Sequence, residues 1–244
     1  MSKLSVQLYS VREAFAADPG DTLAKLAGIG FTQVEPFGLA EHAPVLRTAL
    51  GEHGLAAPTA HAKLIGVDQD EVFAAAVACG VRIVIDPFVP DEQWRTEADV
   101  TATAAALNAA AKRAADHGLV VGYHNHWWEL QNKIGDRTAF EVFADRLDPE
   151  LVLEVDTYWA AAGGADVPAL LAALGDRVKA LHVKDGDLAT DPSGQVPAGQ
   201  GRVGVDGIVA AAPDALRVVE FDTYVGDIFE GLAASHAYVT GLAR

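Results

Sequence analysis

The sequence predicts a single (β/α)8 barrel (TIM barrel), an α/β fold with an inner ring of parallel strands, over residues 1–244. Three observations predict it. Short β-branched runs alternate with Ala- and Leu-rich runs about eight times, which is typical of parallel α/β folds. No G-x-G-x-x-G motif follows the first strand, as it more often does in an open doubly wound sheet. No linker divides the chain, whose length is ordinary for one barrel.

The predicted strands are short runs rich in β-branched, aromatic and alternating apolar residues, bounded by turn residues. In chain order they are residues 4–11, 32–37, 57–62, 81–88, 119–126, 151–158, 178–184 and 216–222. Successive side chains of a strand point to opposite faces. One face of each strand should therefore pack on the helices, while the other points into the barrel.

The predicted helices lie between these strands and have apolar side chains at helical spacing. Some are marked by apolar residues: Leu23, Leu26 and Ile29 (with Asp21 as N-cap), Val45, Leu46 and Leu50, and Phe140, Val142 and Phe143. The others are residues 100–115, 167–174 and 228–242. Glycines at 30, 54, 80 and 118 should supply the left-handed residue after a helix. The Gly-, Pro- and Asp-rich stretch 187–205 is predicted to be a long active-site loop.

Composition narrows the classes of partner. The net charge is −16, from 18 basic and 34 acidic residues, so nucleic acid and anionic membranes are not expected as partners. No apolar run reaches the ~20 residues that span a bilayer. The single cysteine, Cys79, excludes an internal disulfide. A strand-like segment follows Met1–Lys3 without a signal peptide, so we expect a cytoplasmic protein with a small-molecule partner. The sequence is also compatible with a homo-oligomer.

Ionisable and polar residues gather near the carboxyl ends of the predicted strands, where barrels of this kind carry their functional groups. The inward-facing candidates are Gln7, Tyr9, Glu35, His61, Asp86, His124, His126, Glu154, Asp156, His182, Lys184, Glu220 and Asp222. Burying so many without a purpose would be costly.

Three of these candidates come from consecutive strands and can converge on one point. Asp156, His182 and Glu220 offer two carboxylates and an imidazole, which suit Mn²⁺, Mg²⁺, Co²⁺ or Zn²⁺. The same three side chains could instead form an ion-paired core. Their spacing alone does not decide between a metal site and such a core.

Five segments of the chain resemble the sugar phosphate isomerase/epimerase family, which has a xylose isomerase-like barrel. They are Gln7-Leu8-Tyr9-Ser10-Val11-Arg12, Gly122-Tyr123-His124-Asn125-His126 followed by Glu129, Glu154-Val155-Asp156-Thr157-Tyr158-Trp159, Leu181-His182-Val183-Lys184-Asp185, and Val219-Glu220. The resemblance covers essentially the whole chain, with its motifs in order at the predicted strand ends. It does not specify a substrate.

The resemblance implies one divalent metal ion, with Mn²⁺ as the first candidate, held by four side chains. Three correspond to Asp156, His182 and Glu220. Relatives often have a Glu at the end of strand five, where this chain has His124. We assign the nearest acid of that loop, Glu129, as the fourth ligand, with His124 as the alternative.

The implied function is a metal-dependent isomerase or epimerase of carbohydrate metabolism. It would act on a keto sugar or related polyol by removing a proton α to a metal-bound carbonyl. Glu220 is expected to carry one proton transfer and Glu129, His124 or His126 the other. Lys184 could polarise a substrate oxygen or pair with Asp185 or Asp156. The same site could serve a lyase or dehydratase of a 3-keto-glycoside or keto-inositol, because a β-substituent can leave after the same proton abstraction.

Substrate contacts are expected at the mouth of the barrel. Trp127, Trp128 and Trp159 could stack on a sugar ring or belong to the core. Glu35 and His61 resemble substrate-binding positions of the family, and Tyr9 lies in its opening motif. The segment Gly199-Gln200-Gly201-Arg202 is a weak phosphate signal, so a non-phosphorylated sugar is an equal expectation. Endonuclease IV shares the barrel, but the acidic charge argues against DNA repair. A catalytically inactive binding barrel is the remaining alternative.

Overall fold

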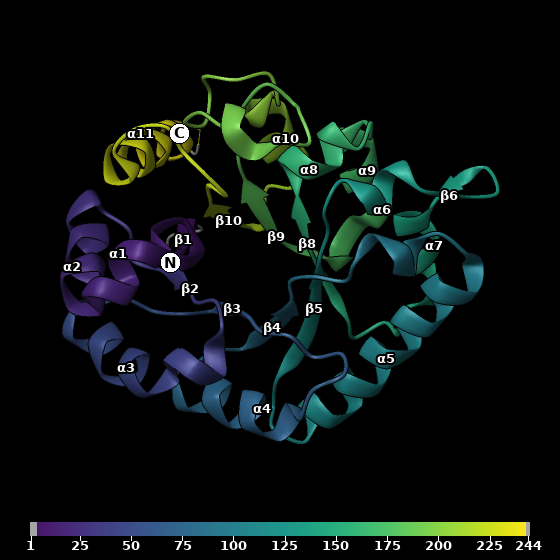
Figure 1. Cartoon of the computed structure of the whole chain (residues 1–244), viewed down its shortest axis with the longest axis horizontal. Coiled ribbons are helices and arrows are strands. Elements are labelled where there is room, and N and C mark those ends of the chain that lie inside the picture. The colour runs from purple at the N-terminus through teal and green to yellow at the C-terminus, as the bar shows by residue number, and fades with distance from the viewer. Residues whose placement is uncertain (1–3, 243–244) are drawn as a thin grey trace.

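The computed structural model describes residues 4–242 and contains one sheet of eight parallel strands (Figure 1). The strands are β1 (Leu4–Gln7), β2 (Val34–Glu35), β3 (Thr59–His61), β4 (Ile83–Asp86), β5 (Val120–His124), β8 (Val152–Asp156), β9 (Val178–Val183) and β10 (Leu216–Val219). Their spatial order is β2-β1-β10-β9-β8-β5-β4-β3, so the first strand pairs with the last. A bridge between Gln33 and Ala56 joins β2 to β3, and the barrel is nearly closed, as predicted.

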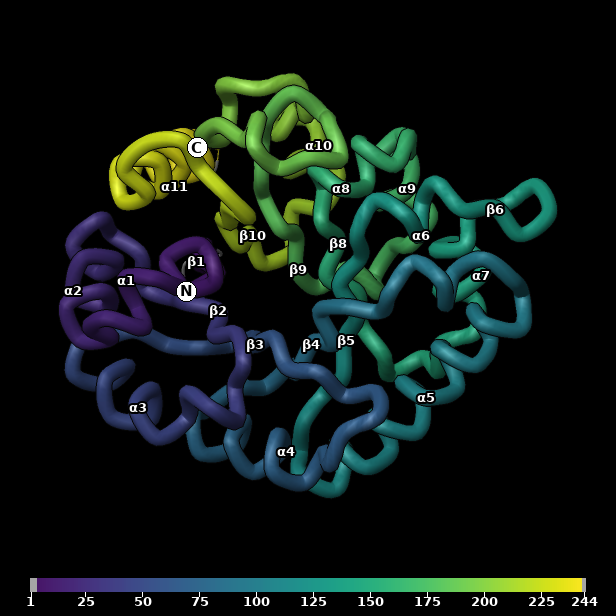
Figure 2. Tube along the Cα trace, viewed as in Figure 1, coloured from purple at the N-terminus to yellow at the C-terminus, as the bar shows by residue number. Residues whose placement is uncertain are grey.

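The helices form a ring outside the strands (Figure 1). They are α1 (Arg12–Ala17), α2 (Pro19–Ile29), α3 (Leu39–Glu52), α4 (Gln69–Ala78), α5 (Glu97–Ala115), α6 (Trp128–Gln131), α7 (Ala139–Arg146), α8 (Thr157–Ala162), α9 (Val167–Leu174), α10 (Val205–Ala211) and α11 (Ile228–Gly241). Figure 2 shows the yellow α11 beside the purple N-terminal segment, and α11 contacts both α2 and β1. The last helix thus packs beside the first part of the chain.

Local chemistry explains where several helices begin and end. The Thr96 side chain accepts from the Asp99 N–H at the start of α5, and Thr138 and Glu141 form a reciprocal capping box at the start of α7. The predicted glycines at 30, 54, 80 and 118 all have positive φ. A left-handed residue at these positions turns the chain back toward the next strand.

The structure differs from the sequence expectation at several element boundaries. Residues Leu8–Val11 form a 3₁₀ turn rather than the end of β1, because the Gln7 side chain accepts from the Tyr9 N–H. Asp18, not Asp21, caps α2, since its carboxylate accepts from the Asp21 N–H. Val45 is 45% exposed and does not belong to the buried stripe of α3. A short hairpin, β6 (Lys133–Ile134) with β7 (Arg137–Thr138), was not predicted.

The long loop after β9 is organised by the carboxylate of Asp185. Its two oxygens accept from the backbone N–H groups of Gly186, Gly199, Gly201 and Val203 at 2.9–3.0 Å. A Cβ at Gly201 would collide with this carboxylate, so the close approach requires glycine there. The predicted irregular segment therefore has a defined path over the carboxyl end of the barrel.

Among the described residues, no helix combines the length and the apolar character needed to cross a membrane. The expected absence of a signal peptide concerns Met1–Lys3, which lie outside the described residues.

Candidate functional site

The carboxyl ends of three neighbouring strands bring Asp156, His182 and Glu220 together. Asp156 ends β8, His182 lies in β9 and Glu220 follows β10. Their ligand atoms all lie within 4.8 Å of one another, and all three side chains are buried. The His182 Nδ1 atom is 2.7 Å from Glu220 Oε2. The group is dense enough to hold a cation.

Lys184 places an ammonium group among the same carboxylates. Its Nζ lies 2.8 Å from Asp156 Oδ2, 2.6 Å from Glu220 Oε2 and 2.7 Å from Asp222 Oδ2. Burial opposes its charge, but the carboxylates of Asp156, Asp222 and Glu220 outweigh burial and raise the pKa of Lys184 well above its usual value. The Trp159 ring centre lies 5.5 Å from the ammonium. Lys184 is therefore a fixed cation of the site.

The donor set fits a divalent metal ion. Three carboxylates face a single ammonium, so the group retains excess negative charge that His182 alone would have to balance. Burial raises the pKa of Asp156 to about 6, whereas Lys184 and His182 overcome burial and hold the pKa of Glu220 well below its usual value. Carboxylate and imidazole ligands suit Mn²⁺ and related ions.

A second buried group lies beside the first and shares His182. The Nε2 atom of His182 is 2.7 Å from Glu35 Oε1 and 3.0 Å from Glu154 Oε2. His61 Nε2 lies 2.6 Å from the same Glu154 oxygen, and His124 Nδ1 lies 3.1 Å from it. Carboxylates that hold one imidazole nitrogen orient the other. Glu35 and Glu154 thus fix the His182 ring with Nδ1 toward Glu220.

Of the two candidates for the fourth ligand, Glu129 turns both carboxylate oxygens to other partners, whereas His124 reaches both buried groups. Glu129 Oε1 accepts from the Tyr123 hydroxyl at 2.7 Å, and Oε2 accepts from the His126 N–H at 2.9 Å. Burial raises the pKa of Glu129 to about 8. Both of its oxygens therefore support the turn between β5 and α6. His124 lies between the two groups, with Nδ1 3.1 Å from Glu154 Oε2 and Nε2 3.7 Å from Asp156 Oδ2.

A cavity of about 530 Å³ opens above these groups. It is lined by Tyr9, Phe37, Gly38, His61, Ala62, Lys63, Pro87, Phe88, His124, His126, Glu220 and Asp222. Burial and the neighbouring His124 lower the pKa of His126 well below its usual value, so this imidazole is neutral. The His126 ring stacks on Trp128 with 4.4 Å between centres. The cavity thus combines two carboxylates, Glu220 and Asp222, and a neutral imidazole with apolar side chains.

The expected substrate-binding residues are placed differently from one another. Tyr9 and His61 line the cavity, whereas Trp159 is buried beside Lys184. Trp127 packs edge-on against Trp128 and is not among the residues that line the cavity. Glu35 is fully buried and holds His182 instead of facing the cavity.

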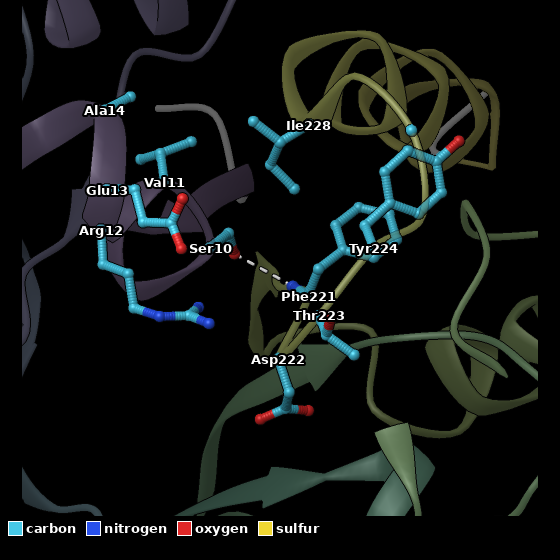
Figure 3. Close-up of a pocket in the computed structure, with 11 residues that line it drawn as sticks. Ser10, Val11, Arg12, Glu13, Ala14, Phe221, Asp222, Thr223, Tyr224 and Ile228 are labelled. Atoms are coloured by element: carbon cyan, nitrogen blue, oxygen red, sulfur yellow. Dashed lines mark hydrogen bonds between the residues drawn. The ribbon is translucent and has the colours of Figure 1, made fainter. Parts of the chain in front are cut away.

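A smaller cavity of about 220 Å³ lies between the turn after β1 and the segment after β10 (Figure 3). Asp222 lines both this cavity and the larger one. The dashed line in Figure 3 marks the bond in which Ser10 Oγ accepts from the Phe221 N–H at 3.0 Å. This bond ties the first and last strand ends together beside the site.

Some residues of the site carry no signal in the sequence. Gln195, from the long loop, donates through Nε2 to Asp222 Oδ2 at 2.7 Å and accepts the Asp222 N–H at 2.8 Å. It therefore fixes the carboxylate that faces Lys184. Glu154 was expected to point inward, but alternation along a strand could not show that it gathers three histidines.

The fold and this site define a (β/α)8 barrel with a buried carboxylate–imidazole centre at the carboxyl ends of its strands. The family model of the xylose isomerase-like TIM barrel matches residues 23–215, and the chain belongs to that family.

Solved structures of low sequence identity share the fold. A sugar phosphate isomerase/epimerase from Parabacteroides distasonis is 22% identical with a TM-score of 0.82, over 98% of this chain and 93% of that one. A probable 3-DHS dehydratase from Bacillus anthracis, involved in petrobactin synthesis, is 15% identical with a TM-score of 0.78, over 98% of this chain and 99% of that one. A D-psicose 3-epimerase is 14% identical with a TM-score of 0.70, over 99% of both chains. The search of curated proteins found no match.

Proposed function

We propose that this protein is a divalent-metal-dependent isomerase or epimerase of a keto sugar or related polyol. The observation that carries the proposal is the buried group of Asp156, His182 and Glu220 with Lys184, beneath a cavity that also presents a neutral His126. Structural neighbours named as sugar phosphate isomerase/epimerase and D-psicose 3-epimerase support it. The substrate would be a small molecule, and we expect a cytoplasmic enzyme.

Asp156, His182 and Glu220 would hold the metal ion, for which Mn²⁺ is the first candidate. A bound divalent ion supplies Lewis acidity that stabilises negative charge developing beside a ketone. The Glu35 and Glu154 carboxylates would keep the His182 ring in its orientation.

Glu220 is the residue we assign to proton removal α to the ketone. Lys184 and His182 overcome burial and hold its pKa low, so the carboxylate is ionised and ready to accept a proton. His126 lines the same cavity with a neutral imidazole and would carry the second proton transfer by taking the proton of a substrate hydroxyl and returning it to the oxygen of the former ketone. Lys184 would place positive charge near the substrate oxygen.

The loop after β9 favours a non-phosphorylated substrate. The N–H groups of Gly199 and Gly201, which could cradle a phosphate, already donate to Asp185. Arg202 is then the remaining candidate phosphate ligand of the segment Gly199-Gln200-Gly201-Arg202, and its side chain is exposed.

The second candidate function is a lyase or dehydratase of a 3-keto-glycoside or keto-inositol. The neutral His126 favours it, because an imidazole that takes the α-proton itself becomes the imidazolium that can return this proton to the departing β-substituent. A structural neighbour named as a probable 3-DHS dehydratase supports this alternative.

The test is Glu220→Gln, with Glu41→Gln on the exposed side of α3 as the matched control. With Mn²⁺ present, the wild type should exchange the α-hydrogen of a ketohexose or of a 3-keto-glucoside with D₂O. Glu220→Gln should reduce turnover on the order of 10²–10⁴-fold, the usual worth of a positioned proton carrier. Undiminished turnover by Glu220→Gln would remove this residue from the base role. Full activity after exhaustive chelation would refute metal dependence.

A further inference from the structure

A second hollow adjoins the site cavity and is here called the side groove. Its volume is about 440 Å³, and it is lined by Lys63, Ile65, Pro87, Phe88, Val89, Pro90, Gln93, Ala102, Thr103 and Ala106. Lys63, Pro87 and Phe88 line both the side groove and the site cavity. A molecule bound over Glu220 could therefore extend into the groove without leaving the protein surface.

The walls of the side groove are held in place by the barrel itself. The Asp86 carboxylate accepts from the N–H groups of Leu64 and Ile65 at 2.8 and 3.2 Å, and from the Phe88 N–H at 3.2 Å. One carboxylate thus joins the loop after β3 to the loop after β4. The Val89 carbonyl accepts from the indole N–H groups of Trp94 and Trp128, each at 3.2 Å. The groove is preformed, which lowers the cost of ligand binding.

The lining is apolar except for Lys63, Gln93 and Thr103. Phe88 stands where the two hollows meet and is 51% exposed. Its ring packs edge-on against His126 and Trp128, with 5.4 and 5.6 Å between centres. The exposed part of the ring is available to stack on an aromatic group.

Polarity therefore changes from one hollow to the other. The site cavity contains Glu220, Asp222 and His126, which suit hydroxyl and keto groups, whereas apolar side chains dominate the groove. We propose that the substrate is a keto sugar carrying an apolar, preferably aromatic, substituent. The sugar ring lies over Glu220, and the substituent crosses Phe88 into the side groove. This inference rests on the proposed function, because it places a sugar in the site cavity.

The test compares methyl and phenyl 3-keto-β-glucosides with Mn²⁺ present. Calorimetry measures binding, and exchange of the α-hydrogen with D₂O measures chemistry. The wild type should favour the phenyl compound by about 10-fold in Kd and in KM, as expected from burying a phenyl ring. Ala106→Trp should fill the groove and bring the ratio near 1. Ala105→Trp, on the exposed side of α5, should leave the ratio unchanged. Phe88→Ala is a second variant that should reduce the preference.

The outcomes separate this inference from the proposed function. Hydrogen exchange with equal affinity for both compounds would show that the side groove does not bind the substituent, while the proposed reaction stands. The same holds for a phenyl preference that Ala106→Trp and Phe88→Ala leave intact. A phenyl preference that Ala106→Trp removes, with neither hydrogen exchange nor product formation, keeps the groove and overturns the reaction. If neither compound binds, both are overturned.

Discussion

Replacement of Lys184 by methionine tests whether the site depends on a built-in cation. The wild-type ammonium lies within 2.6–2.8 Å of Asp156, Glu220 and Asp222, and it is almost completely buried. Methionine keeps much of the length and apolar volume but leaves these carboxylates without their positive partner. Removal of one partner from a buried ion pair costs about 3–5 kcal/mol. For a chain of this size that loss lowers the melting temperature by about 6–20 °C.

The measurement is urea unfolding followed by circular dichroism at pH 7 with chelator present. Lys179→Met is the matched control, because Lys179 is exposed on β9, the strand that Lys184 follows, and its loss should cost little. Added Mn²⁺ should stabilise Lys184→Met more than the wild type, since the unpaired carboxylates gain a divalent counter-charge.

A metal-free Lys184→Met protein within about 1 kcal/mol of the wild type would refute this reasoning, because the lost ion pairs should cost several times more. The carboxylates would then have to be neutralised by protonation instead of by the ammonium. An equal response of both proteins to Mn²⁺ would show that metal and ammonium do not act on the same carboxylates.

Two further predictions concern the supports of the site. Asp185→Asn should lower the free energy of unfolding by about 2–6 kcal/mol, because asparagine keeps one acceptor oxygen and leaves two of the four backbone N–H groups unpaired. The control is Asp136→Asn at an exposed position. Equal urea midpoints for the two variants would contradict the prediction. In metal-stripped protein, burial raises the pKa of Glu129 to about 8. Between about pH 5 and 8 the folded protein keeps this carboxyl protonated while the unfolded chain loses the proton, so the free energy of unfolding falls as pH rises through this range. Glu129→Gln should therefore gain a few kcal/mol relative to the wild type over that range, and a difference that does not change with pH would contradict the prediction.

The sequence determined the barrel because its evidence is local and repeated. Period-two runs alternate with helical runs, and glycines such as Gly80 and Gly118 end helices in the left-handed conformation. Alternation along a strand also determined that Glu154 and Asp156 point inward. Neighbouring strands of a parallel barrel end at one face, so the sequence alone predicts that Asp156, His182 and Glu220 lie together.

The tertiary structure alone decided which inward side chains meet. Glu129 is three residues after His126 in the sequence. The turn before α6 nevertheless directs its oxygens to the Tyr123 hydroxyl and to the His126 N–H. Gln195 comes from a loop of irregular structure and still reaches Asp222. The side groove needs two loops and one face of α5 at a fixed separation. Periodicity reports which face a residue occupies, whereas contact between residues far apart in the chain depends on strand register, loop path and packing, which no local pattern encodes.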